Sequence, residues 1–288
     1  MSNNPELVTI ICTRDRGIQV LQSYSLDLMV TDSCIHHVIV EDNGMTQEEW
    51  LALLGPYYTR HRLNLIPGNA LLSTEYYEND SAIRNGWHRS AVLKLLTSQH
   101  VQADKYLILD SKNFFVHEQN LNDWPIHDGN GILETYDSRG WSEIDSFCAK
   151  HDIPVPTQVY NSSTPFVLDT ATVKEIVKFD ILPLFFNKKS WWSSEIFLYS
   201  IFTQYLGQPL TQSAVPNVTF WNTERALDKT TLNDCYTWPN MRAFGLHRDV
   251  LKLKTDLTQL MDFLIEIGFD SNTVTQALEQ YRQDIGKV

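Results

Sequence analysis

The sequence has few cysteines, few basic residues and no long apolar run among its 288 residues. Cys12, Cys34, Cys148 and Cys235 stand singly, without a CxxC pair or zinc-finger spacing, so we expect reduced, mostly buried thiols. No stretch approaches the roughly 18 apolar residues that span a bilayer, and the first residues lack the pattern of a secretory signal. These absences predict a cytoplasmic protein without an integral membrane segment.

Basic residues are outnumbered, because 23 Lys and Arg face 35 Asp and Glu, which gives a net charge of −12. Affinity for nucleic acids and for anionic lipids comes largely from Lys and Arg, so the composition argues against both as partners. The chain also lacks a GxSxG elbow, a Walker loop, a GxGxxG turn and an HExxH helix. Hydrolase, kinase and dehydrogenase functions therefore lose their usual support, and an anionic ligand requires a local basic pocket.

The first half of the chain alternates short β-rich apolar runs with helical patterns, which is typical of βαβ units and a mainly parallel sheet flanked by helices. A clear helix follows, in which Trp87, Ala91, Val92, Leu95 and Leu96 form one apolar stripe. The expected strands are Leu7 to Cys12, His37 to Glu41, Leu63 to Ile66 and Lys105 to Asp110, and the expected helices before Trp87 are Ile18 to Met29 and Thr46 to Leu54.

The second half is less regular, and three short strands are expected there, at Gly131 to Glu134, Pro165 to Leu168 and Ala243 to Leu246. Ser193 or Ser194 can cap a helix whose apolar stripe is Leu198, Ile201, Phe202 and Tyr205. The end of the chain predicts a helical hairpin, because Gly268 separates two apolar stripes. The stripes are Leu257, Leu260, Met261 and Leu264, then, after a start at Asp270 or Ser271, Val274, Leu278, Tyr281 and Ile285.

Polar residues follow three of the expected strands, in the stretches Thr13 to Gly17, Glu41 to Gly44 and Asp110 to Asn113. Ligands of open α/β sheets bind beyond the carboxyl ends of the strands, so this edge is the first place to look for a site. It collects carboxylates suited to hydroxyl groups, and two arginines and a lysine suited to phosphate. Each stretch alone also fits a turn or a solvated helix start, and it is their coincidence that favours a site.

Several of these residues resemble a known family. Gly86-Trp87-His88-Arg89-Ser90, then Lys94-Leu95-Leu96, then Tyr106 to Lys112 are similar to bacterial glycosyltransferase-like proteins of the GT-A fold, which have a Gly-Trp helix and an apolar strand closed by Asp-x-Asp. Weaker similarity extends to Thr164 to Leu168, to Ser194 to Tyr199 and to His247-Arg248.

The resemblance implies one GT-A-like, Rossmann-like α/β domain over residues 1–288. Residues 1–116 would be the nucleotide-sugar-binding half, 117–250 the acceptor-binding half, and 251–288 the helical hairpin. The implied activity is transfer of a sugar from a nucleotide-sugar donor to a saccharide or glycan-precursor acceptor, in surface polysaccharide assembly.

By the same resemblance, Thr13 and Arg14 lie near the nucleotide and Asp42 meets the base or ribose. Trp191 and Trp192 are candidates to stack on acceptor sugar rings, although paired tryptophans are often core residues. Further donor-site candidates are Arg16, Asn43, Arg89, Asp110, Lys112 and His247, and Glu134 is a further acceptor-site candidate.

Lys112 departs from the family pattern, because it stands where the second acid of Asp-x-Asp would help to hold Mg²⁺ or Mn²⁺. An ammonium group cannot bind a metal ion and would repel one nearby. One interpretation is that Lys112 itself contacts the diphosphate, so that fixed cations replace the metal. The other is a degenerate site in which Asp110 and Lys112 are a plain ion pair. Asp110 alone would hold a divalent cation only weakly.

Glu195, at a helix start, is the candidate base for the acceptor hydroxyl, with Glu134, Asp137 and Asp169 as rivals. An acid in a first helical turn is also stabilised by the helix dipole without any further role. Adjacent strand residues point to opposite faces, so His36 and His37 are a poor metal pair.

Two other functions stay open: a catalytically silent nucleotide-sugar or glycan-binding protein, and a nucleotidyltransferase, which normally needs the missing metal carboxylates. The oligomeric state is also open, although exposed apolar area on the hairpin would favour a homodimer.

Overall fold

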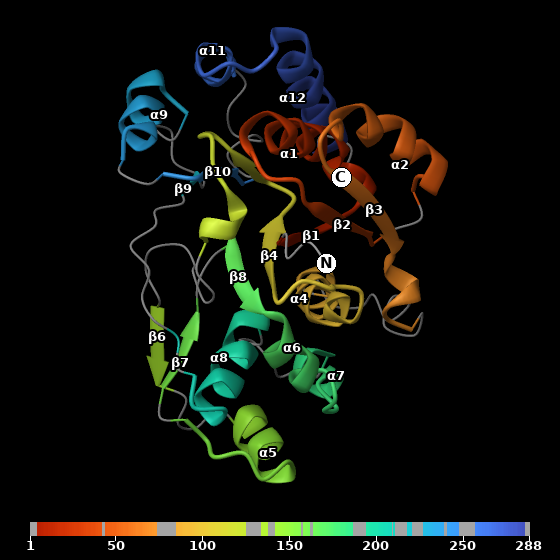
Figure 1. Cartoon of the computed structure of the whole chain (residues 1–288), viewed down its shortest axis with the longest axis vertical. Coiled ribbons are helices and arrows are strands. Elements are labelled where there is room, and N and C mark those ends of the chain that lie inside the picture. Colours follow the sequence, from red (N-terminus) through yellow and green to blue (C-terminus); the bar gives the residue numbers. More distant parts are fainter. Residues whose placement is uncertain are drawn as a thin grey trace.

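A computed structural model describes residues 5–41, 44–73, 85–124, 134–137, 142–156, 158–161, 164–186, 194–208, 210, 218–220, 227–238, 241–247 and 257–285. Its central sheet has the strand order β3-β2-β1-β4-β8 (Figure 1). The strands are β1 (Glu6–Ile11), β2 (Ile35–Val40), β3 (Arg62–Pro67), β4 (Lys105–Asp110) and β8 (Phe166–Asp169). The first four run parallel and β8 is antiparallel to β4, so the carboxyl ends of β1, β2 and β4 meet at one edge.

Side chains alternate across β1, with Leu7 and Ile11 in one hydrophobic core and Val8 and Ile10 in another. The first core lies against α1 (Arg16–Met29), α2 (Gln47–Leu54), α9 (Lys229–Tyr236), α11 (Thr258–Glu266) and α12 (Ser271–Ile285). The second lies against α4 (Asn85–Leu96), α5 (Ser142–Lys150), α6 (Thr170–Ile176), α7 (Leu182–Phe186) and α8 (Glu195–Tyr205). Helices thus cover both faces of the sheet, which explains why its strands are apolar on both sides.

Two smaller sheets complete the fold. One has the order β5-β10-β9, from β5 (Asn113–Phe115), β10 (Ala243–Leu246) and β9 (Val218–Phe220). The other pairs β6 (Glu134–Asp137) with β7 (Gln158–Asn161). Short 3₁₀ helices are η1 (Thr13–Asp15), η2 (Gly55–Tyr57), η3 (Gly68–Ala70), η4 (Thr97–Gln99) and η5 (Leu121–Asp123). Because β10 pairs with β5, the late part of the chain lies beside the turn that follows β4.

The C-terminal hairpin packs on the first helix, and α12 lies beside α1 (Figure 1). Gly268 ends α11 with a φ of 105°, a conformation that favours glycine, and Asp270 caps α12 by accepting a hydrogen bond from the backbone of Thr273. Contact with α1 is close at Gly17, where an added Cβ would lie 2.3 Å from the backbone oxygen of Ala277. The predicted inward stripe of α12 is buried, at Val274, Leu278, Tyr281 and Ile285.

The structure confirms the predicted fold class, a mainly parallel central sheet flanked by helices with a C-terminal helical hairpin. Two side chains of the predicted apolar stripes are misplaced, however, because Trp87 is 51% exposed and Tyr205 is 49% exposed. Each lies near a helix end, Trp87 at the start of α4 and Tyr205 at the end of α8. The strand expected from Gly131 falls on the described residues only at Glu134, where β6 begins. Among the described helices, none is long and apolar enough to cross a membrane.

Candidate functional site

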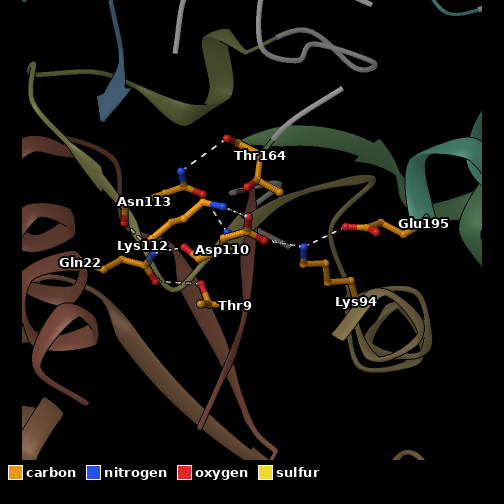
Figure 2. Close-up of polar contacts among 8 residues, drawn as sticks. All are labelled: Thr9, Gln22, Lys94, Asp110, Lys112, Asn113, Thr164 and Glu195. Carbon is orange, nitrogen blue, oxygen red and sulfur yellow. Dashed lines mark hydrogen bonds and ion pairs between the residues drawn. The ribbon is translucent and has the colours of Figure 1, made fainter. Parts of the chain in front are cut away.

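The turn after β4 is held by hydrogen bonds from α1 and from β10, and Figure 2 shows those from Gln22 of α1. Gln22 of α1 donates from Nε2 to the backbone oxygens of Asp110, at 2.8 Å, and Asn113, at 2.7 Å. Within the turn, Asn113 Oδ1 accepts from the backbone of Asp110 at 2.8 Å. Leu246, the last residue of β10, donates its backbone N–H to the oxygen of Lys112 at 3.1 Å. The backbone that presents Asp110 and Lys112 is therefore fixed before any ligand arrives.

A buried chain of hydrogen bonds fixes Gln22 in turn. Thr9 of β1 donates to Gln22 Oε1 at 2.9 Å, so the Thr9 oxygen accepts from His36 Nε2, 2.8 Å away. His36 Nδ1 is then the acceptor for the Tyr58 hydroxyl at 2.7 Å. Burial, together with the smaller effects of the neighbouring His37 and His61, lowers the pKa of His36 to about 3, which keeps the ring neutral. His36 therefore supports the candidate site through Thr9 and Gln22.

Four charged side chains alternate in sign across the site: Lys112, Asp110, Lys94 and Glu195 (Figure 2). Lys112 Nζ lies 3.1 Å from Asp110 Oδ2, and Lys94 Nζ lies 2.7 Å from Asp110 Oδ1 and 2.8 Å from Glu195 Oε1. Lys94 and Glu195 form the buried end of the row, with 6% and 7% of their side chains exposed, whereas Lys112 and Asp110 are 21% and 32% exposed. The exposed end is the one that a ligand can reach.

The ion pairs decide which of these groups carry charge. Burial disfavours the charged form of Asp110, but Lys94 and Lys112 outweigh that effect and hold its pKa well below the usual range. Burial likewise opposes the charge on Lys94, but Asp110 and Glu195 outweigh it and raise the pKa of Lys94. Asp110 is therefore a carboxylate and Lys94 an ammonium near neutral pH, and neither is placed to exchange a proton during a reaction.

These residues do not fit a divalent metal ion of the kind that an Asp-x-Asp motif binds. Both oxygens of Asp110 already have an ammonium partner, and a cation placed beside them would be repelled by Lys94 and Lys112. Hard cations such as Mg²⁺ and Mn²⁺ take several oxygen ligands. Within the described ranges, no group of three or more His, Cys, Asp or Glu side chains could hold a metal.

The ends of β1 and β2 place a second polar group at the same edge. The pKa of Arg14 is raised overall. Partial burial acts to lower it, but the neighbouring Cys12, Asp15 and Glu41 outweigh that effect. Burial raises the pKa of Asp15 and of Glu41, although Arg89 on α4 donates to Glu41 Oε1 at 2.7 Å and acts in the opposite direction. The strand ends of β1 and β2 and the start of α4 therefore converge, as predicted for a parallel sheet.

Thr13 lies at this edge too, in close contact with Gly44. An added Cβ on Gly44 would lie 2.1 Å from Thr13 Oγ1, so a larger residue does not fit there without movement. Arg16 points elsewhere, because its guanidinium donates to both carboxylate oxygens of Asp284 on α12, each at 2.7 Å. His247 directly follows β10, one residue beyond the partner of Lys112.

Other predicted site residues are placed less completely. Asp42, Asn43, Trp191 and Trp192 lie outside the described residues, and of Glu134 only the backbone position in β6 is described. Their roles stay predictions.

Lys94 belongs to a stretch that carries the family resemblance, but no role at the site was predicted for it. It sits in α4 among Ala91, Val92, Leu93 and Leu95, all of them buried. A lysine in a helical run that is otherwise apolar indicates a buried charge that needs partners, and this pattern can be read from the sequence. The sequence does not indicate that the partners are Asp110 and Glu195.

Comparison with known proteins places the chain in a family. The model of DUF6492, a family of unknown function, matches residues 16–242. The chain belongs to the DUF6492 family. No protein of curated function matches this DUF6492 member by sequence.

Solved glycosyltransferase structures resemble this DUF6492 member in fold. The galactosyltransferase LgtC, in complex with donor and acceptor sugar analogues, has a TM-score of 0.52 at 12% identity, over 92% of this chain and 97% of LgtC. The apo form of mouse xyloside xylosyltransferase 1 has a TM-score of 0.45 at 10% identity, over 84% of this chain and 97% of that one. GlyE of Streptococcus pneumoniae TIGR4 has a TM-score of 0.48 at 11% identity, over 98% of this chain and 64% of GlyE. The likeness to LgtC shows a GT-A-like fold.

Proposed function

We propose that this DUF6492 protein is a glycosyltransferase that binds a nucleotide-sugar donor without a divalent metal. The observation that carries the proposal is the row of charges in which Lys94 and Lys112 flank Asp110. The GT-A-like fold supports sugar transfer as the general activity. In this proposal residues 1–116 bind the donor and residues 117–250 bind a saccharide or glycan-precursor acceptor, as in surface polysaccharide assembly.

Charge balance supports the replacement of the metal. Two carboxylates with one divalent cation carry no net charge, and neither do Lys112, Asp110, Lys94 and Glu195 together. The exposed cation of the row is Lys112, which can meet the diphosphate as a fixed point charge. A cation held there before the reaction stabilises the negative charge that develops on the leaving diphosphate. Arg14 supplies a second cation at the same edge.

The role of base is assigned to Glu195 as a prediction, with Glu134, Asp137 and Asp169 as alternatives. Glu195 is 5% exposed and its Oε1 accepts a hydrogen bond from Lys94 at 2.8 Å, which gives it a second task in positioning that lysine. This pairing also favours the second candidate function, a catalytically silent nucleotide-sugar-binding or glycan-binding protein. Glu195→Gln separates the two tasks, because it keeps an acceptor oxygen for Lys94 and removes the base.

The proposal is tested by thermal-shift binding of nucleoside diphosphates and nucleotide-sugars, each with Mn²⁺ and again with EDTA. A ligand present at 100 times its dissociation constant stabilises the folded state by about 2.7 kcal/mol. We expect one nucleotide to raise the melting temperature equally in both conditions. Lys112→Ala should lose this shift, whereas Lys178→Ala, at an exposed pair with Glu175, should keep it.

Three results would count against parts of the proposal. A shift that requires Mn²⁺ would contradict the metal-free site. A metal-independent shift without sugar transfer to any acceptor of a glycan panel would favour the silent binding protein. No shift with any nucleotide would overturn the donor site altogether.

A further inference from the structure

A second hollow lies away from the charged row, between the segment that follows β5 and the segment between α9 and β10. It is an open hollow of about 570 Å³, within the range of about 300–1,000 Å³ that is common for ligand pockets. Its lining includes His117, Asp123, Trp124, Tyr236, Trp238 and Arg242.

This hollow, the η5 pocket, is at the opposite end of β4 from the charged row. Lys105, the first residue of β4, donates its ammonium hydrogens to the backbone oxygens of Asn122 and Trp124. Asp110 is the last residue of the same strand, and at about 3.3 Å per residue the strand separates the two places by about 17 Å. The η5 pocket is therefore not part of the candidate donor site.

Aromatic rings dominate the pocket and are held in place. The rings of His117 and Tyr236 stack with centroids 4.0 Å apart, and His117 Nε2 donates a hydrogen bond to the backbone oxygen of Tyr236 at 2.9 Å. The guanidinium of Arg242 lies 4.2 Å from the centre of the Trp124 ring. Trp238 is 47% exposed, which is unusual for a large indole and leaves a ring surface open to a ligand.

Polar groups complete the lining. Glu118, Asn120 and Asp123 are exposed and add carboxylate and amide oxygens.

This combination selects a class of ligand. The pocket is lined by two carboxylates, of Glu118 and Asp123, and by one guanidinium, of Arg242, which is stacked on the indole of Trp124. This balance of charge disfavours an anionic ligand such as a nucleotide or a sulfated glycan. A sugar ring has apolar C–H faces that pack on aromatic rings and hydroxyl edges that bond carboxylates and amides. We propose that the η5 pocket binds a neutral saccharide, as a subsite separate from the carboxyl edge of the sheet.

The test is direct binding to an array of neutral oligosaccharides, including cellopentaose, maltopentaose and mannopentaose, followed by fluorescence titration of the strongest binder. We expect Trp238→Ala and Asp123→Asn each to weaken binding at least tenfold. Tyr205→Ala removes a similarly exposed ring on α8 and serves as the matched control, with an expected change of less than twofold. Lys112→Ala should also leave saccharide binding unchanged, because Lys112 lies at the other edge.

The outcomes separate this proposal from the donor site. Binding that survives Trp238→Ala and Asp123→Asn, or an array without any bound oligosaccharide, would overturn the proposal. Binding that is lost in Lys112→Ala would place the saccharide at the carboxyl edge and overturn it too. Because Trp238 and Asp123 are exposed, both variants should fold, and equal melting temperatures check that they do.

Discussion

Lys94 holds a full positive charge at 4% exposure, in a helix where its sequence neighbours are apolar. Taking such a charge out of water costs several kcal/mol, and only two carboxylates at hydrogen-bond distance offset that cost. The same contacts make Lys94 the link between α4, the end of β4 and the start of α8. One side chain therefore joins three elements that are distant in sequence.

Replacing Lys94 with Met should lower the free energy of unfolding by about 3–5 kcal/mol, because Asp110 and Glu195 then lose a buried ammonium that they share. Urea denaturation measures the change. The double variant Lys94→Met with Glu195→Gln should recover part of the loss, since it removes the buried charge of Glu195, whereas Asp110 keeps its ion pair with Lys112.

Lys178→Met is the matched control for this experiment, because Lys178 pairs with Glu175 at the surface, and such pairs contribute at most about 1 kcal/mol. A Lys94→Met protein within 1 kcal/mol of the wild type would show that the ammonium is not a structural link.

At the scale of elements, α1 and α12 approach so closely at Gly17 that no side chain fits between them. Gly17→Ala would place a methyl group 2.3 Å from the backbone oxygen of Ala277 and 2.4 Å from the backbone nitrogen of Tyr281. Alanine favours a helix by up to about 1 kcal/mol over glycine, but backbone atoms cannot give way unless α12 shifts.

We therefore expect Gly17→Ala to destabilise the protein by about 1–3 kcal/mol and to speed hydrogen exchange in α11 and α12. Gly86→Ala, in the first turn of α4, is the control, because a Cβ added there would make ordinary contacts, the nearest at 3.9 Å from Glu41 Oε1. Equal exchange rates in the hairpins of Gly17→Ala and the wild type would contradict the close contact.

The elements that the sequence predicted best are those with a complete local pattern. The continuous apolar run of β4, the stripe of α12 and the cap at Ser194 depend on residues close together in the chain, and all three appear as expected. Trp87 and Tyr205 were placed inward because they continue a stripe, and a stripe does not show where the covering layer ends.

The candidate site, like the fold, was predictable where local sequence patterns decide it. Strand ends that meet at one edge follow from parallel pairing, so the neighbourhood of Arg14, Glu41 and Asp110 could be expected. Pairings between distant side chains could not. Arg16 and Asp284 are 268 residues apart, and nothing local to either indicates that they form a bidentate pair.

For the whole molecule, the neutral His36 couples stability to pH. Its pKa is about 3 in the folded protein and near 6.5 when unfolded, so between these values the unfolded chain binds one more proton. Stability then rises with pH through this window, and is lost as pH falls from about 6.5 towards 3, by up to about 1.4 kcal/mol per pH unit.

Urea unfolding at pH 7.5, 6 and 5 should show this slope in the wild type. In His36→Gln the slope of the unfolding free energy against pH should be smaller below pH 6, by up to about 1.4 kcal/mol per pH unit, which corresponds to one proton. His100→Gln changes an exposed histidine and should follow the wild-type curve. If His36→Gln and the wild type share one slope, the folded protein binds a proton at His36 and the buried network must be charged.

The pairing of β10 with β5 also has a consequence for synthesis on the ribosome. The turn that presents Lys112 takes a backbone hydrogen bond from Leu246, so a nascent chain that has emerged only through the central sheet still lacks this support. Contacts over such long sequence separations form late. Strands β1 to β4 can pair during translation, whereas the polar edge reaches its final geometry only after residue 246 has left the exit tunnel.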